Sequence, residues 1–277
     1  MRIETFYVAP KTGGAIAYEA PVTCYLPDRS REIDPERRFP AMVVLPGGGY
    51  RFTSDTEAEP IALRFVAAGF AVFVLRYSVA PATYPQALCE AAQTIATVRE
   101  RAESFFVDPH KVAVCGFSAG GHLAASISNL YGSEDVLSVL GGKAEDYRPD
   151  AHVLSYPVIS YTRPHTGSFH NLLGEAFTEE RALALSMERH VTEHTPPAFL
   201  WSTTTDQSVP VQNTYLYALA LAEHGVPSEV HVYPDGVHGL SLATWVSNKT
   251  EKKHNPIASA WIDEAIRWLT DVFALGK

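Results

Sequence analysis

The chain has 277 residues, of which 46% are hydrophobic and 19% are charged, and its formal net charge is −9 at pH 7. This length corresponds to one large domain or two small ones, and the composition excludes disordered and fibrous classes. The negative charge argues against nucleic acid or an anionic membrane as a partner, because both are bound by clustered Lys and Arg.

The cysteines and the N-terminal residues indicate the cellular compartment of the protein. Cys24, Cys89 and Cys115 are odd in number and widely spaced, which favours buried thiols in a reducing compartment. The residues from Met1 to Thr5 show no apolar signal-peptide core, and no apolar run approaches the roughly 18 residues of a membrane span. We therefore expect a soluble, cytoplasmic protein.

Short apolar runs alternate with segments of helical periodicity along the chain. In chain order we expect a strand in Ala15–Tyr25, a strand at Met42–Leu45, a helix at Ile61–Ala68, a strand at Phe70–Leu75, a helix from Pro85 to Ala102, a strand at Lys111–Cys115, a helix at Ala119–Leu130, strands at Val153–Tyr156 and Ala198–Trp201, a helix at Tyr215–His224, a strand at Glu229–Tyr233 and a helix at Ile257–Phe273. This order is typical of an α/β fold whose mostly parallel sheet has helices on both faces.

Two stretches interrupt the alternation. Residues 131–150 resemble a loop, and residues 161–197 contain a Pro- and His-rich loop followed by a helical piece near Thr178–His190. Neither is long or apolar enough to be a domain, so we expect a single domain over residues 1–277 with a small cap insertion.

The strongest functional signal is Gly116-Phe117-Ser118-Ala119-Gly120, which fits G-x-S-x-G. It follows a predicted strand and opens a predicted helix, which is the context that a nucleophilic serine requires. Glycines on both sides permit the tight turn, and the helix N-terminus favours a developing anion. We therefore predict that Ser118 is a nucleophile.

A nucleophilic serine needs a base and an orienting acid. Asp206 follows the strand at Ala198–Trp201, and His238 lies in a glycine-bounded loop after the last strand. Asp150 lies at the wrong end of its strand, and Asp235 lies within the loop of His238 itself. We predict that Asp206 is the acid and His238 the base.

Pro46-Gly47-Gly48-Gly49-Tyr50 follows the strand at Met42–Leu45. Consecutive glycines let backbone N–H groups approach a reacting oxygen, so this loop and the N–H of Ala119 are predicted to form an oxyanion hole. A phosphate-binding loop is disfavoured, because neither G-x-x-x-x-G-K-[ST] nor G-x-G-x-x-G spacing is present.

These segments together resemble an α/β-hydrolase esterase and lipase group. The glycine loop is similar to the H-G-G-G-[FW] loop of that group, with Pro46 in place of its histidine. The segments Asp108–Ala124, Trp201–Pro210 and Tyr233–Ala243 resemble its nucleophile, acid and histidine regions. The group includes acetyl xylan esterases and feruloyl-esterase-like proteins and is related to hormone-sensitive lipase.

The resemblance implies a serine carboxylesterase that hydrolyses short acyl esters, such as acetyl esters of sugars, without a cofactor or metal. It favours Gly48 and Gly49 as oxyanion donors, with Gly47 as the fallback. Tyr50 and His122 are candidates for the substrate-binding wall. Homo-oligomers are frequent in such enzymes, although nothing in the sequence marks an interface.

Three other functions are compatible with parts of the sequence. A peptidase or lipase of the same fold would use the same triad. A zinc enzyme is suggested by His190-Val191-Thr192-Glu193-His194, which matches H-x-x-E-H, but Thr195-Pro196-Pro197 follows at once where a helix would be needed. A non-catalytic binding protein is disfavoured because all three triad candidates are present.

Overall fold

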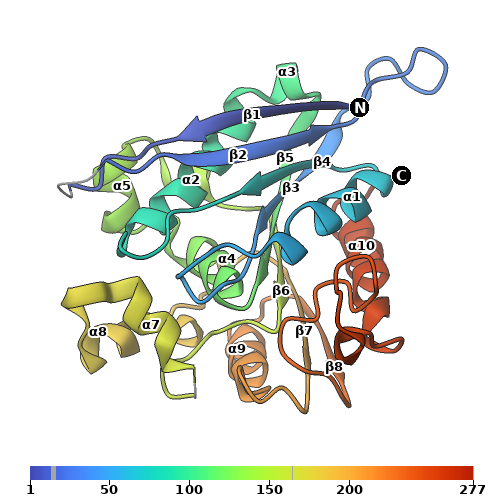
Figure 1. Ribbon diagram of the computed structural model, residues 1–277. Helices are drawn as coiled ribbons and strands as arrows, with labels where there is room; N and C mark the ends of the chain where they lie inside the picture. The colour runs from blue at the N-terminus through green and yellow to red at the C-terminus, as the bar shows by residue number, and fades with distance from the viewer. Residues whose placement is uncertain (14–16, 164, 277) are drawn as a thin grey trace.

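A twisted eight-stranded sheet runs through the described part of the chain, with the strand order β1-β2-β4-β3-β5-β6-β7-β8 (Figure 1). The computed structural model describes residues 1–13, 17–163 and 165–276. β1 and β2 pair antiparallel, β2 pairs antiparallel with β4, and every further pair is parallel. The parallel strands therefore direct their carboxyl ends toward one edge of the sheet.

The strands are β1 (Arg2–Val8), β2 (Ala20–Leu26), β3 (Phe39–Leu45), β4 (Ala71–Leu75), β5 (Val107–Phe117), β6 (Ala151–Ser155), β7 (Ala198–Thr203) and β8 (Ser228–Tyr233). The α-helices are α1 (Glu59–Ala67), α2 (Gln86–Glu100), α3 (Ala102–Phe105), α4 (Ala119–Leu130), α5 (Glu134–Leu140), α6 (Ala144–Tyr147), α7 (Thr166–Leu173), α8 (Glu179–Ala184), α9 (Gln212–Glu223) and α10 (Trp261–Val272). Short 3-10 turns are η1 (Asp55–Glu57), η2 (Gly174–Ala176), η3 (Met187–Arg189), η4 (Glu251–Lys253) and η5 (Ala258–Ala260).

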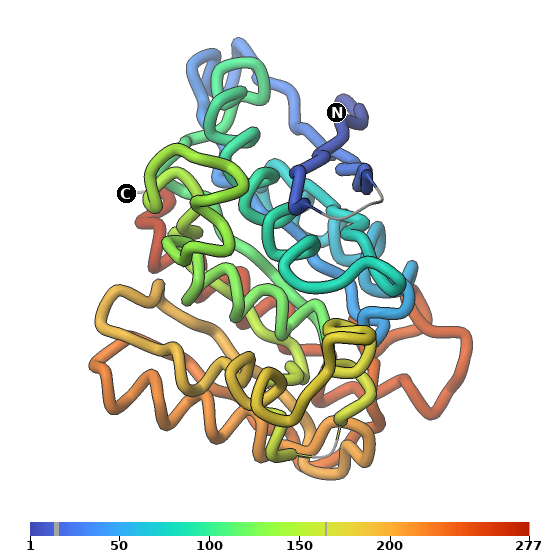
Figure 2. The backbone as a smooth tube through the Cα atoms, turned by 90° about the vertical axis from the view of Figure 1, so that its left-hand side faces the viewer, coloured from blue at the N-terminus to red at the C-terminus, as the bar shows by residue number. Residues whose placement is uncertain are grey.

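Helices cover both faces of the sheet, as Figure 1 shows and as the rotated view in Figure 2 confirms. α2, α4 and α9 pack apolar side chains into one core, and α1 and α10 pack theirs into the other. Every residue of β3 and β4 is buried, as expected for strands covered on both faces. The predicted α/β architecture is confirmed.

Most predicted elements match the structure to within a few residues, but β1 was not predicted. Its residues alternate only weakly in burial, and Val8 alone is fully buried, because β1 is an edge strand. The predicted strand in Ala15–Tyr25 corresponds to β2, and its first two residues lie outside the described residues.

The two interruptions contain more helix than the sequence predicted. Residues 131–150 were expected to be a loop, yet they form α5 and α6. In residues 161–197, α8 and η3 lie where a helical piece was expected, whereas α7 occupies part of the expected loop. Both errors concern helices of eight residues or fewer, for which periodicity is a weak signal.

All three cysteines are buried and unpaired within the described residues. In the same part of the chain, no helix is both long and apolar enough to cross a membrane. The cytoplasmic location stays a prediction.

Candidate active site

Ser118 lies at the sharp turn between β5 and α4, with φ 53° and ψ −117°. A positive φ is uncommon for a non-glycine residue and here marks a strained backbone. A Cβ on Gly116 would lie 2.1 Å from the Gly120 carbonyl oxygen, and one on Gly120 would lie 2.1 Å from that of Leu45. The turn therefore requires glycine at both motif positions.

The structure brings Ser118, His238 and Asp206 together in one hydrogen-bonded chain. Ser118 Oγ donates to His238 Nε2 at 2.8 Å, and His238 Nδ1 donates to Asp206 Oδ2 at 2.6 Å. The Asp206 side chain is 1% exposed and that of His238 is 21% exposed, so only the imidazole has access to solvent. These partners fix the tautomer of His238, with its proton on Nδ1 and a lone pair toward the hydroxyl.

The Asp206 carboxylate is held in place by backbone groups. Its Oδ1 accepts from the N–H groups of Ser208 at 2.8 Å and Val209 at 3.0 Å, which leaves Oδ2 for His238. The rejected carboxylates have other partners: Asp150 pairs with Arg99, and Asp235 accepts from Thr205.

The glycine loop after β3 lies beside Ser118. The N–H of Gly47 donates to Glu57 Oε2 at 2.8 Å and is therefore already used. Within the described residues, the N–H groups of Gly48, Gly49 and Ala119 have no hydrogen-bond acceptor. Gly48 and Gly49 line the pocket at Ser118, so the loop offers these two amides there and withholds the Gly47 amide.

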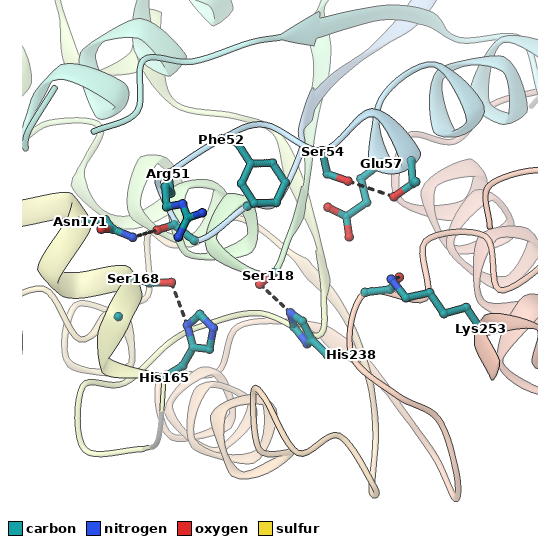
Figure 3. A pocket seen from close by; sticks show the side chains of 15 residues that line it. Arg51, Phe52, Ser54, Glu57, Ser118, His165, Ser168, Asn171, His238 and Lys253 are labelled. Carbon is teal, nitrogen blue, oxygen red and sulfur yellow. Dashed lines mark hydrogen bonds between the residues drawn. The ribbon is translucent and has the colours of Figure 1, made fainter. Parts of the chain in front are cut away.

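A pocket of about 480 Å³ opens at Ser118 and His238 (Figure 3). Its other lining residues are mostly polar and come from four segments: Gly48, Gly49, Arg51, Phe52, Ser54, Thr56 and Glu57 after β3; His165, Gly167, Ser168 and Asn171 at α7; Gly239 beside His238; and Lys253 in η4. The insertion at residues 161–197 thus forms one wall of the pocket.

Side chains from α7 organise that wall. His165 Nδ1 lies 2.8 Å from Ser168 Oγ, and the His165 ring lies 6.2 Å from that of His238. Burial and the proximity of the His238 imidazole lower the pKa of His165. Asn171 Nδ2 donates to the carbonyl oxygen of Gly49 at 2.8 Å, which ties the wall to the glycine loop.

Tyr50 and His122 do not line this pocket. They are 3% and 1% exposed, and the Tyr50 hydroxyl lies 2.9 Å from His122 Nδ1 beneath the glycine loop. His122 Nε2 donates to the Leu185 carbonyl oxygen at 2.8 Å, so Nδ1 accepts from Tyr50. The structure thus places these two predicted wall residues in the packing behind the loop.

Glu57, Asn171 and Lys253 lie outside the motifs recognised in the sequence, so the sequence alone does not mark them as site residues. Glu57 belongs to no known sequence motif, and Asn171 lies in a helix where the sequence predicted a loop. At the H-x-x-E-H sequence, residues 190–194 form no helix, and His190 Nε2 donates to the Ala184 carbonyl oxygen.

Comparison with known proteins identifies the family. The sequence profile of BD-FAE matches residues 25–221, which include Ser118 and Asp206. The chain belongs to the BD-FAE family. The BD-FAE match begins in β2 and ends within α9, so it covers most of the sheet and the glycine loop.

The chain is also similar to individual known proteins. Over 73% of this chain, the sequence is 37% identical to endo-1,4-beta-xylanase B of Butyrivibrio fibrisolvens. Over 82% of this chain, it is 32% identical to an acetylxylan esterase of Xylanibacter ruminicola. These matches cover only 32% and 45% of the two relatives. The acetyl ester-xyloside bifunctional hydrolase of Caldicellulosiruptor lactoaceticus superposes with a TM-score of 0.81 at 36% identity, covering 94% of this chain and 90% of that one.

The structural similarity also supports the predicted fold family. Solved structures that match nearly the whole chain include an α/β-hydrolase enzyme and a carboxylesterase. This BD-FAE chain therefore has the α/β-hydrolase fold, as its motifs indicated.

Proposed function

We propose that the protein is a serine carboxylesterase that hydrolyses short acyl esters, of the acetyl type, carried by sugars. The observation that carries the proposal is the hydrogen-bonded chain from Ser118 through His238 to Asp206, which opens on a pocket beside acceptor-free backbone amides. Such a chain is the arrangement that activates a serine for acyl transfer.

In the proposed mechanism, Ser118 Oγ attacks the ester carbonyl carbon while His238 Nε2 takes its proton. Asp206 holds the imidazole in the required tautomer and stabilises its positive charge. The oxyanion accepts hydrogen bonds from the amides of Gly48, Gly49 and Ala119, and one such donor typically contributes about 2.7–4 kcal/mol.

Collapse of the tetrahedral intermediate breaks the bond to the alcohol, whose oxygen receives the proton from His238. A water molecule then attacks the acyl-enzyme, with His238 accepting the water's proton. The second collapse releases the carboxylic acid and returns the proton to Ser118 Oγ. Only the chain's own groups and water are needed.

Two lines of support point to an acetylated sugar. The pocket lining includes hydroxyl, amide and imidazole groups, which can bind the hydroxyl groups of a sugar. Two similar proteins are named an acetylxylan esterase and an acetyl ester-xyloside hydrolase. We further propose that residues 1–277 act as one domain, whose insertion at 161–197 forms the wall of this pocket.

The test is an ester series, from acetyl to decanoyl p-nitrophenyl esters, together with an acetylated xylo-oligosaccharide and a peptide p-nitroanilide. We expect preference for acetyl, release of acetate from the sugar, and loss of roughly three to six orders of magnitude in kcat for Ser118→Ala. Full activity of Ser118→Ala would overturn the nucleophile. A decanoyl preference would indicate a lipase, and anilide cleavage without ester cleavage a peptidase.

A further inference from the structure

Glu57 is a buried carboxylate that the acyl-transfer steps leave unused. It lies in η1 and is 4% exposed. Its Oε2 accepts from the Gly47 N–H at 2.8 Å, and its Oε1 accepts from the Tyr156 hydroxyl at 2.6 Å. Figure 3 shows its carboxylate extending toward the side of the pocket that holds Ser118 and His238.

Tyr156 carries the connection onward to the loop of His238. The Tyr156 hydroxyl accepts from the backbone N–H of Ser241 at 2.9 Å, three residues after the histidine. The Tyr156 ring also packs edge-on against the His238 ring, with centroids 5.1 Å apart. In addition, Ser241 Oγ donates to the Thr56 carbonyl oxygen, next to Glu57, at 2.5 Å. Glu57 thus lies between the two loops that act on the substrate.

The surroundings of Glu57 suit an acceptor on both oxygens. Burial raises the pKa of its carboxyl group, whereas the hydrogen bonds from Tyr156 and Gly47 and the nearby side chains of His238 and Lys253 lower it. The titratable groups that face it are Tyr77, Cys115, Tyr156, His238 and Lys253. No other carboxylate interacts with it in the described residues, so its charge is opposed only by burial.

We propose that Glu57 is a positioning residue that fixes the glycine loop through Gly47 and the histidine loop through Tyr156, so that both stay aligned on Ser118. The proposal deepens the esterase function and rests on it. By engaging the amide of Gly47, the carboxylate sets the orientation of that peptide, which leaves the amides of Gly48 and Gly49 to face the reacting carbonyl.

A glutamine at position 57 cannot do this, although it has the same size. A carboxylate accepts on both oxygens, whereas a carboxamide has one acceptor oxygen and one NH2 donor group. The NH2 would face either the Gly47 N–H, donor against donor, or the Tyr156 hydroxyl, which would then accept this bond and lose the acceptor for its own proton. Either outcome breaks one of the two bonds that the carboxylate makes to the loops.

The experiment compares Glu57→Gln with Tyr156→Phe and with a control, Glu90→Gln. Glu90 is also fully buried and accepts from Ser78 and Gln86, but it lies outside the pocket lining. For each variant, kcat and KM on p-nitrophenyl acetate, the rate of labelling of Ser118 by a fluorophosphonate, and the melting temperature are measured.

For Glu57→Gln we expect kcat and the labelling rate to fall about 10- to 100-fold, with KM within about threefold of wild type, because displaced loops weaken transition-state contacts. For Tyr156→Phe we expect kcat and the labelling rate to fall as well, but by a smaller factor. Glu90→Gln should melt at a lower temperature while keeping wild-type kcat and labelling.

Wild-type kcat and labelling in a folded Glu57→Gln variant would overturn the proposal, as would a rise in KM alone. If Glu57→Gln does not fold, Tyr156→Phe decides, and a wild-type labelling rate there overturns it. A wild-type protein that is labelled but cleaves no ester would refute the esterase function alone, and the labelling rates would still test Glu57. If wild type is neither labelled nor active, both proposals fail.

Discussion

Acid should destabilise the folded protein through His122, and the effect can be isolated with one substitution. The imidazole is buried in α4, donates to Leu185 and accepts from Tyr50, so it is neutral in the folded state. Burial lowers its pKa from 6.5 to about 4. Glutamine at this position can donate and accept in the same way but does not titrate.

The magnitude follows from proton linkage. The unfolded chain binds a proton at His122 as the pH falls below 6.5, whereas the folded protein does so only near pH 4. Stability from this group is therefore fully present above about pH 6.5 and is lost as the pH falls toward 4. A shift of this size corresponds to about 3 kcal/mol in total, of which about 2 kcal/mol is lost by about pH 5.

Urea unfolding of wild type and His122→Gln at about pH 7.5 and about pH 5 provides the assay. His152, whose pKa burial lowers to about 3, contributes equally to both proteins and cancels in the comparison. We expect wild type to lose about 2 kcal/mol more than the variant between the two pH values. Equal losses in the two proteins would refute the reasoning.

Three further outcomes are expected. Asp206→Asn should stay folded and lose about four orders of magnitude in kcat, because the amide favours the wrong imidazole tautomer; a loss below tenfold would argue against its role. Gly48→Ala should abolish esterase activity or folding, since its Cβ would lie 2.0 Å from the Phe52 carbonyl oxygen. The control is Gly167→Ala in the same pocket, whose Cβ would meet nothing within 4 Å, and this variant should melt at the wild-type temperature. A thiol reagent should react with all three cysteines only after unfolding, and rapid reaction of the native protein would contradict their burial.

The sequence predicted the features that local chemistry dictates. The strand, the turn at Ser118 and the following helix could be read from one segment, because a continuous apolar run, two glycines and helical periodicity coincide there. Asp206 and His238 were found because each follows a strand whose carboxyl end lies at the same edge of the sheet.

What was missed depends on contacts between distant segments. Nothing near Glu57 reveals that its carboxylate meets Tyr156, 99 positions further along the chain. Tyr50 and His122 were expected at the wall because of their neighbours in sequence, but the packing turns them beneath the loop. Short helices such as α7 gain their stability from burying Phe169 and Leu172 against the core rather than from propensity.

The pocket has a divided origin, with its reacting groups on loops at the end of the sheet and one wall on α7. Because the two parts come from different segments, the wall could be replaced by that of a related protein. The replacement would change which ester fits, while the reacting groups stay the same. The bond from Asn171 to the Gly49 carbonyl sets a condition on that exchange. A transplanted wall that lacks an amide there would alter the loop that we propose binds the oxyanion, so selectivity and rate would change together.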